Sequence, residues 1–451
     1  MVRRLAVIMV TLLAVLSGAS AQAQVTVEKP NVIFILTDDL DKRLLTSHLS
    51  DFPNIRALAN KGTTFSKAFV TNALCCPSRS TILTGQYSHN HGVMTNTAPD
   101  GGASAFRPLE PYALPVWLKN AGYTTGYVGK YLNEYDGTYA PPGWDEWHGV
   151  NTDTGEALEP GQMTDVFSDQ ADSFLRNHSG STPFYLQVAP LAPHTPATPY
   201  PRHSTLFAGE KTPRPRSFNE QNVSDKPNYV RKLKPLSRDQ IASLNELYRN
   251  RLRSMMAVDE MVGRLVTTLK DTDELSSTYI VFASDNGVHA GQHRLREGKR
   301  LAYEEDIRVP LIVRGPDVPA GVTRSQMVLN NDLAPTFAEW AGATPLLTVD
   351  GRSLTPLLGS SPPARWRTAF LAEAAPHEQI GRPAYRAVRT QNYLYVSYAD
   401  GEKELYNLVR DPYELTSYYP TAGSSLKDRL RSRLSSLAGC VGAGCGSAEG
   451  P

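Results

Sequence analysis

Residues 31–39 read Asn-Val-Ile-Phe-Ile-Leu-Thr-Asp-Asp, an unbroken apolar run that ends in two acids. A strand that is apolar on both faces is typical of the interior of an α/β sheet, where helices cover both sides. Residues 279–287 repeat the pattern and read Tyr-Ile-Val-Phe-Ala-Ser-Asp-Asn-Gly, and residues 184–189 form a third apolar run. These runs predict an α/β fold.

Polar side chains stand at the ends of two of these runs: Asp38, Asp39, Asp285 and Asn286. Open α/β sheets place ligands at the carboxyl ends of their strands. An acidic pair after one strand is often only a solvated turn, so the prediction depends on the repetition of the pattern. Four oxygen donors without sulfur or imidazole suit a hard cation such as Ca²⁺ or Mg²⁺.

Residues 74–85 read Leu-Cys-Cys-Pro-Ser-Arg-Ser-Thr-Ile-Leu-Thr-Gly. Pro77 fits the first position of a helix, and Gly85 can end that helix in the left-handed conformation. Cys75 is then expected at the helix N-terminus, where unpaired N–H groups and the helix dipole favour an anion. Arg79 follows one turn further on.

The segment from Cys75 to Arg79, Cys-Cys-Pro-Ser-Arg, resembles the Cys-x-Pro-Ser-Arg signature of the sulfatase family, and the Thr-Gly-Gln-Tyr that begins at Thr84 extends the match. The resemblance implies that a formylglycine-generating enzyme oxidises Cys75 to formylglycine. It also implies an alkaline-phosphatase-like fold, with a large mixed, mostly parallel sheet between helices and a small C-terminal antiparallel sheet. The metal is then expected to be Ca²⁺ rather than Mg²⁺, held by Asp38, Asp39, Cys75, Asp285 and Asn286.

Further positions match functional residues of the family. Lys130 follows a glycine at the end of an expected strand, Lys299 follows Asp285 in the chain, and His194 lies in a Pro-x-x-Pro-His-Thr-Pro segment. The resemblance implies a catalytic set of Cys75, Arg79, Lys130, His194 and Lys299, in which His194 protonates the leaving group. The sequence departs from the family at Leu132, where many members carry a histidine.

Two histidines, His89 and His91, follow the expected helix closely, and we expect one of them to contact the substrate or the formylglycine. A different reading of this region is that Cys75 and Cys76 are disulfide partners, since four cysteines allow three pairings. Cys440 and Cys445 are close enough in sequence to pair with each other.

The segment Lys-Tyr-Leu-Asn that begins at Lys130 resembles the same segment in one branch of the family, the N-acetylglucosamine-6-sulfatases and heparan endosulfatases. This implies a sulfatase for 6-sulfated glucosamine or related sulfated glycans, with a sulfated sugar or an aryl sulfate as substrate. Three alternatives remain: an arylsulfatase of broad specificity, a phosphodiesterase or phosphonate monoester hydrolase of the same superfamily, and a non-catalytic binder of sulfated glycans.

The first 23 residues have two arginines, an apolar run and small residues before a cleavage point, which predicts a signal peptide. We therefore expect a protein without a membrane anchor that is secreted, periplasmic or extracellular, or lysosomal in a eukaryote. A net charge of +1 argues against a nucleic-acid partner.

The 451 residues exceed what one core usually supports, so two domains are expected. Residues 28–359 are predicted as the catalytic domain and residues 364–451 as a small α+β subdomain. The alternating residue pattern over 393–398 indicates a strand of a small antiparallel sheet in this subdomain. The longest helix is predicted over 237–270, with a capping box from Ser237 to Gln240. A shorter one is expected between Asp51 and Gly62, with Asp51 as its cap.

Overall fold

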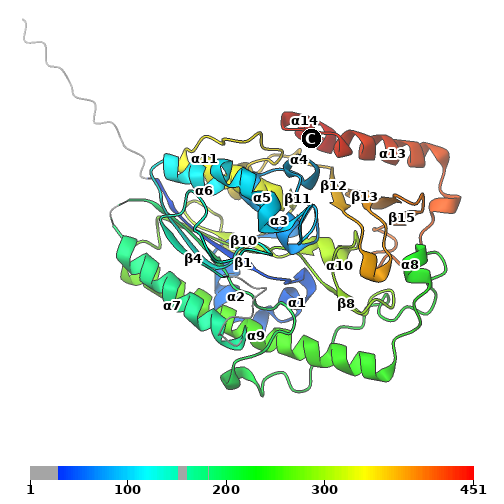
Figure 1. Ribbon diagram of the computed structural model, residues 1–451, viewed down its shortest axis with the longest axis horizontal. Coiled ribbons are helices and arrows are strands. Elements are labelled where there is room, and N and C mark those ends of the chain that lie inside the picture. The colour runs from blue at the N-terminus through cyan, green and yellow to red at the C-terminus, as the bar shows by residue number, and fades with distance from the viewer. Residues whose placement is uncertain (1–28, 151–159, 181) are drawn as a thin grey trace, which may run out of the picture.

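A computed structural model of the chain describes residues 29–150, 160–180 and 182–451. The signal peptide predicted over residues 1–23 lies outside the described residues. A large central sheet lies between two layers of helices, and a smaller sheet packs beside it (Figure 1).

The central sheet has the strand order β11-β2-β10-β6-β1-β5-β3-β4, and β9 pairs with β2. Neighbouring strands are parallel except for the antiparallel pairs that β10 makes with β6 and β2 and that β9 makes with β2. The sheet is therefore mixed and mostly parallel, as predicted. Its strands are β1 (Asn31–Thr37), β2 (Thr63–Phe69), β3 (Thr124–Lys130), β4 (Glu146–Val150), β5 (Phe184–Ala189), β6 (Thr278–Ser284), β9 (Arg308–Val309), β10 (Leu311–Arg314) and β11 (Val322–Leu329).

The side chains of β1 alternate between two cores. Ile33 and Ile35 pack in the cluster below the sheet, with α2 (Pro53–Asn60), α7 (Pro160–His178) and α9 (Arg238–Asp271). Val32, Phe34 and Leu36 pack in the other cluster, with α3 (Cys75–Thr84), α6 (Leu114–Asn120) and α11 (Leu333–Ala341). Because helices cover both faces (Figure 1), β1 has to be apolar throughout.

The register of β1 and β6 fixes where their polar ends meet. The two strands are parallel, and Thr37 lies opposite Ser284 at the last pair of the ladder. The residues that follow each strand, Asp38 and Asp285, therefore emerge at the same edge of the sheet.

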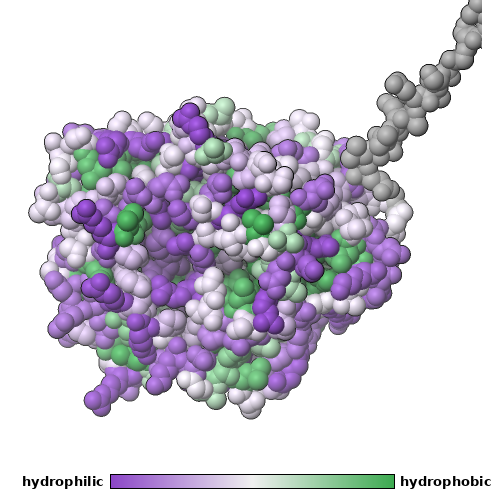
Figure 2. Space-filling model, turned by 180° about the vertical axis from the view of Figure 1, so that it is seen from behind, coloured by the Kyte–Doolittle hydropathy of each residue, from purple (hydrophilic) through white to green (hydrophobic). Residues whose placement is uncertain are grey.

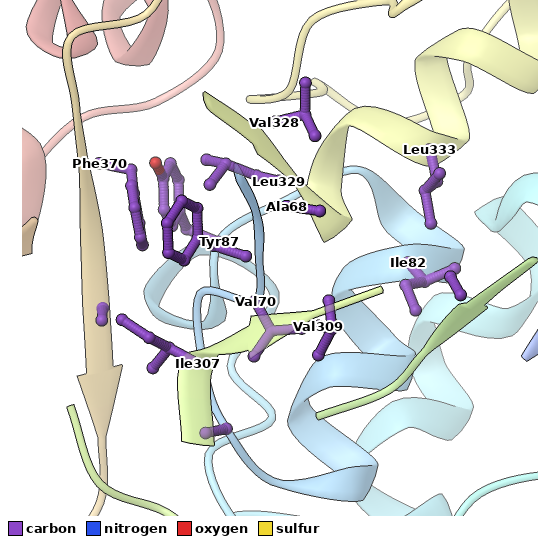
Figure 3. Packing of buried hydrophobic residues seen from close by; sticks show 14 of the residues in the cluster. Ala68, Val70, Ile82, Tyr87, Ile307, Val309, Val328, Leu329, Leu333 and Phe370 are labelled. Atoms are coloured by element: carbon purple, nitrogen blue, oxygen red, sulfur yellow. The ribbon is translucent and has the colours of Figure 1, made fainter. Parts of the chain in front are cut away.

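The smaller sheet is antiparallel, as predicted, and consists of β12 (Ala369–Ala374), β13 (Tyr385–Thr390), β14 (Tyr393–Tyr398) and β15 (Lys403–Asn407). Its core is continuous with that of α3: Figure 3 shows Tyr87, just after α3, beside Phe370 of β12, and both side chains are buried. The smaller sheet therefore supports the segment that carries Cys75.

The end of the chain packs on the smaller sheet as α13 (Ser424–Ala438) and α14 (Ala443–Glu449), and a disulfide joins Cys440 to Cys445. The sequence did not predict α14. The fully buried Arg367 bonds to Asp332 and to Glu449, which fastens this last helix to the core.

Three helix starts test the local predictions. The capping box of Ser237 and Gln240 is present at the start of α9. In contrast, α3 begins at Cys75 and not at Pro77, which occupies its third position. Asp51 does not cap α2, because Pro53 takes the first helical position and Asp51 ends a preceding 3₁₀ turn.

The remaining α-helices and β-strands are short. They are α1 (Lys42–Ser47), α4 (Ser88–His91), α5 (Gly102–Phe106), β7 (His289–Ala290), β8 (Glu297–Gly298), α8 (Asn228–Arg231), α10 (Glu304–Ile307) and α12 (Thr355–Leu358).

Hydrophilic residues cover most of the face shown in Figure 2, and hydrophobic residues form small patches between them. Of the helices that the structure describes, none has both the length and the apolar content needed to cross a bilayer.

Candidate active site

The loops after β1 and β6 bring the four predicted oxygen donors together. The Asp39 backbone N–H donates to Asp285 Oδ1 over 3.0 Å, and Asn286 Nδ2 donates to Asp39 Oδ1 over 2.6 Å. Asp38, Asp285 and Asn286 are fully buried, and Asp39 is nearly so. Asp39 has a φ of 66°, a left-handed conformation that is uncommon outside glycine and concentrates at functional sites.

Cys75 joins this group from the N-terminus of α3. Its Sγ lies 3.5 Å from Asp38 Oδ1 and is fully buried. Neither Cys75 nor Cys76 is in a disulfide, since the one disulfide among the described residues joins the other two cysteines. The reading of Cys75 and Cys76 as disulfide partners is therefore wrong.

Three basic side chains surround the group. Lys130 Nζ, from the end of β3, lies 2.5 Å from Asp38 Oδ2. Lys299 Nζ, just after β8, lies 2.5 Å from an oxygen of Asp39 and 2.7 Å from the Cys75 Sγ. Arg79 Nε donates to Asp285 Oδ2 over 2.9 Å. Residues from five parts of the chain thus meet at one point.

His194 lies on the solvent side of the group, in the proline-rich loop after β5. Its Nε2 is 3.6 Å from Asp39 Oδ2, and its side chain is 36% exposed. Its Nδ1 donates to the Thr195 carbonyl over 2.6 Å, which orients the ring. Burial lowers the pKa of His194, but the charges of Asp38 and Asp39 outweigh it and raise the pKa to about 9.

The pKa values of Asp38 and Asp285 are shifted in opposite directions. Burial raises the pKa of Asp38, but Lys130 and the other cations outweigh it and hold the pKa well below its usual range. The pKa of Asp285 is instead raised, because burial and the charge of Asp38 outweigh its contact with Arg79. The negative charge of Asp285 is therefore less favoured than that of Asp38.

A hard divalent cation fits this donor set. Asn286 Oδ1 is buried and has no hydrogen-bond partner among the described residues, which leaves a carbonyl oxygen free for coordination. Three carboxylates next to it supply the oxygen ligands that Ca²⁺ and Mg²⁺ prefer. Ligand atoms of Asp38, Asp39, Cys75 and His194 all lie within 4.8 Å of one another, so one ion can reach several of them.

A cavity of about 220 Å³ opens beside the cluster. Its lining includes Asp38, Lys130, Asn133, His194 and Ser254. A small anion can therefore approach the buried group from the side of His194.

The rings of His89 and His91 bond to groups outside this cluster, and their substrate contact stays a prediction. His91 is buried, its Nε2 lies 3.0 Å from Thr81 Oγ1, and its Nδ1 accepts from the Val93 N–H. His89 Nδ1 lies 2.8 Å from a Glu373 oxygen, and its Nε2 lies 3.1 Å from the Cys440 carbonyl. Both histidines connect α4 to its surroundings.

Sequence reasoning missed several residues that shape the site. Asp306 accepts from the Leu301 N–H over 2.8 Å, and its carbonyl accepts from the Gly287 N–H, so it links the loop of Lys299 to the loop of Asn286. Asn133 and Ser254 line the cavity. Only Asn133 had a sequence signal, because it stands beside the departure at Leu132.

Known proteins resemble this chain along most of its length. A family model described as Sulfatase matches residues 30–343, and one described as N-sulphoglucosamine sulphohydrolase, C-terminal, matches residues 291–439. An N-acetylglucosamine-6-sulfatase of Homo sapiens is 34% identical over 92% of this chain and 86% of its own. An arylsulfatase of Volvox carteri is 32% identical over 97% of this chain and 79% of its own.

Solved structures show the same architecture. One, in complex with its substrate D-glucosamine-2-N,6-O-disulfate, has a TM-score of 0.77 at 27% identity and covers 90% of this chain and 97% of its own. A phosphonate monoester hydrolase from Silicibacter pomeroyi has a TM-score of 0.73 at 22% identity, covers 90% of this chain and 94% of its own, and shares the fold.

Proposed function

The chain belongs to the sulfatase family and is a sulfuric ester hydrolase, and from this premise we propose that it is an exported, calcium-dependent sulfatase for 6-sulfated glucosamine or related sulfated sugars. The observation that carries this proposal is the meeting of Cys75, Asp38, Asp39 and Lys299 at the N-terminus of α3.

The proposed reactive position is Cys75, oxidised to formylglycine by a formylglycine-generating enzyme. Once hydrated, this aldehyde supplies a hydroxyl nucleophile for sulfur. The free thiol at the start of α3 supports the assignment, because the positive end of a helix stabilises negative charge that develops there.

The proposed metal ligands are Asp38, Asp39, Asp285 and Asn286, together with the group formed from Cys75. A bound Ca²⁺ supplies positive charge to the sulfate and to the nucleophile. Mg²⁺ is the second choice, because it demands a stricter octahedral geometry than this irregular set of loop residues provides.

The proposed role of Lys130 and Lys299 is to neutralise the sulfate oxygens. Burial lowers the pKa of each lysine, but the neighbouring carboxylates outweigh it and raise the pKa above its usual range, so both are charged at neutral pH. Arg79 holds Asp285 by its Nε and the Lys130 carbonyl by its Nη1 over 2.7 Å. It thereby fixes both sides of the anion site.

The proposed general acid is His194. A pKa of about 9 leaves its imidazole protonated at neutral pH, and its position on the solvent side of the cluster lets it meet the departing alcohol. Thr195 holds the other ring nitrogen, so the Nε2–H is the proton to be donated.

The proposed substrate follows from the relatives. Those named above are an N-acetylglucosamine-6-sulfatase and an arylsulfatase, and one solved structure holds a 6-sulfated glucosamine. Export is supported by an extracellular sulfatase homolog of Drosophila melanogaster that is 37% identical over 77% of this chain and 33% of its own. We therefore place the protein outside the cytoplasm: secreted, periplasmic or extracellular, or lysosomal in a eukaryotic host.

The proposed domain division has residues 28–359 as the catalytic domain and residues 364–451 as a small subdomain.

The test is sulfate release by protein that has been matured with a formylglycine-generating enzyme and loaded with Ca²⁺. We expect the highest kcat/KM on N-acetylglucosamine 6-sulfate and a lower one on an aryl sulfate, with Cys75→Ala as the inactive control. If the kcat/KM on the aryl sulfate exceeds that on N-acetylglucosamine 6-sulfate, the protein is an arylsulfatase of broad specificity. If the kcat/KM on a phosphonate monoester exceeds both, it is a phosphonate monoester hydrolase. Inactivity on every ester, with the aldehyde confirmed, overturns the proposal.

A further inference from the structure

We propose that Arg251 is a positioning residue, which fixes the backbone of Asp39 and thereby directs the Asp39 carboxylate into the metal site. This inference rests on the proposed function, in which Asp39 is a metal ligand. It gives a role to a residue of α9 that lies outside the ligand set.

The backbone of Asp39 needs support from its surroundings. Its φ of 66° lies in the left-handed region, which costs free energy in a residue other than glycine and persists only where neighbouring groups hold it. The Asp39 N–H donates to Asp285 Oδ1, and the Leu40 N–H donates to Ser284 Oγ over 2.8 Å. Neither bond involves the Asp39 carbonyl, which needs a donor of its own.

Arg251 supplies that donor from the helix layer below the sheet. Its Nη2 donates to the Asp39 carbonyl and, over 3.0 Å, to Asp41 Oδ2. Arg251 is only 3% exposed, and a buried charge is favourable only where it is paired. Asp41 in turn caps α1, because its Oδ1 accepts from the Leu44 N–H over 2.8 Å. One buried cation therefore joins α9, the Asp39 backbone and the start of α1.

The carboxylate and the carbonyl of Asp39 have different partners. Asp39 Oδ1 accepts from Asn286 Nδ2 and Lys299 Nζ within the cluster, whereas the carbonyl accepts from Arg251. If Arg251 is lost, the buried carbonyl is left without its charged donor. A rotation of this backbone toward another donor also moves the carboxylate away from the cluster. Groups that orient a metal ligand in this way typically change metal affinity about tenfold to a hundredfold.

Arg253, on the same helix, provides a matched comparison. It is 9% exposed, its Nε donates to the Leu206 carbonyl over 2.8 Å, and its Nη1 donates to Glu246 Oε1 over 3.0 Å. Arg251 and Arg253 thus each pair with one backbone carbonyl and one carboxylate. Neither partner of Arg253 belongs to the metal site, so this residue separates an effect on Asp39 from a general loss of packing around α9.

The experiment measures the Kd of Ca²⁺ by isothermal titration calorimetry on the matured, chelator-treated protein and on its variants, with the Tm of each. We expect Arg251→Met to raise the Kd about tenfold to a hundredfold. Arg251→Lys keeps the charge, but its side chain is one bond shorter, so we expect a smaller increase. Arg253→Met should lower the Tm and leave the Kd unchanged.

An unchanged Kd in Arg251→Met overturns the inference, and so does an Arg253→Met protein whose Kd rises as much. If Arg251→Met does not fold, Arg251→Lys decides alone: a raised Kd supports the inference, and an unchanged Kd overturns it. A wild-type protein that binds no Ca²⁺ overturns this inference and the proposed metal together. A failure of the proposed reaction alone appears as a wild-type protein that binds Ca²⁺ but cleaves no sulfate ester.

Discussion

Lys299 Nζ lies 2.7 Å from the Sγ of Cys75, although 224 positions separate the two residues. The short β7–β8 hairpin, in which His289 faces Gly298, brings Lys299 to this place. The Arg300 N–H donates to the Ala73 carbonyl over 3.0 Å and ties the two segments together. The lysine is therefore positioned to act on whatever group forms at Cys75.

Replacing Lys299 by Met removes this charge and keeps most of the side-chain volume. We expect kcat to fall about a hundredfold to a thousandfold, the range for the loss of one preorganised charge partner in a transition state. Steady-state kinetics on a sulfate ester measures it. Lys61→Met, at an exposed position, is the control. A Lys299→Met enzyme with wild-type kcat would show that Lys299 has no role in the reaction.

Removal of Ca²⁺ is expected to abolish activity and to lower the Tm. Asp38, Asp39 and Asp285 are buried together, and the raised pKa of Asp285 shows that its negative charge is disfavoured without an ion. A ligand present at about 100 times its Kd adds about 2.7 kcal/mol to stability. Thermal unfolding with a chelator and after return of Ca²⁺ measures the effect.

Asp285→Asn should weaken this response to Ca²⁺, whereas the exposed Asp100→Asn should keep it. An Asp285→Asn protein whose Tm rises with Ca²⁺ as much as that of the wild type would exclude Asp285 as a ligand.

His91 should make the fold sensitive to acid. Burial, with a contribution from His89, lowers the pKa of His91 to about 3, so the folded protein keeps it neutral. The unfolded chain binds that proton below about pH 6.5, hence the stability is complete above that pH and is lost as the pH falls toward 3. The loss from this one group is about 2 kcal/mol between pH 7 and pH 5.

Urea unfolding at the two pH values measures this loss, and His91→Gln should reduce it. His89 is a contrasting control: burial lowers its pKa, but the bond to Glu373 outweighs it and raises the pKa. His89→Gln should therefore weaken the protein more at pH 5 than at pH 7. Equal acid sensitivity in wild type and His91→Gln would contradict the assignment of a neutral, buried His91.

The contact between Glu449 and Arg367 should stabilise the whole fold. Glu449 accepts from Arg367 Nε over 2.7 Å and from Tyr87 Oη over 2.6 Å, and it is fully buried. Glu449→Ala leaves part of a buried charge unpaired, which costs about 3 kcal/mol. Chemical denaturation measures it against Glu378→Ala, an exposed control. A loss no larger than that of the control would show that α14 adds nothing to stability.

The sequence predicted the parts of the fold that depend on local pattern. The runs that became β1 and β6 are apolar throughout because helices cover both faces, and the capping box at Ser237 depends on two residues three positions apart. The Ala- and Gly-rich text of α14 has no helical pattern of apolar residues, and a disulfide and the bonds of Glu449 hold this helix in place.

The same division applies to the site. Asp38, Cys75 and Asp285 lie in recognisable sequence motifs. Their closeness in the fold was therefore predicted from the sequence. Asp306 and Ser254 act through contacts made far along the chain, which no local pattern reveals. His91 stands close to Cys75 in sequence, yet α4 turns its ring toward Thr81 in the core. Closeness in sequence therefore did not reveal the contact of His91 with Thr81.

The most direct test of the account is mass spectrometry of the Cys75 peptide, taken from protein that releases sulfate from a sulfate ester. We expect an aldehyde at Cys75, an unmodified thiol at Cys76, and a rate of sulfate release that rises with the fraction of aldehyde. Active protein in which Cys75 is still an unmodified thiol would contradict it.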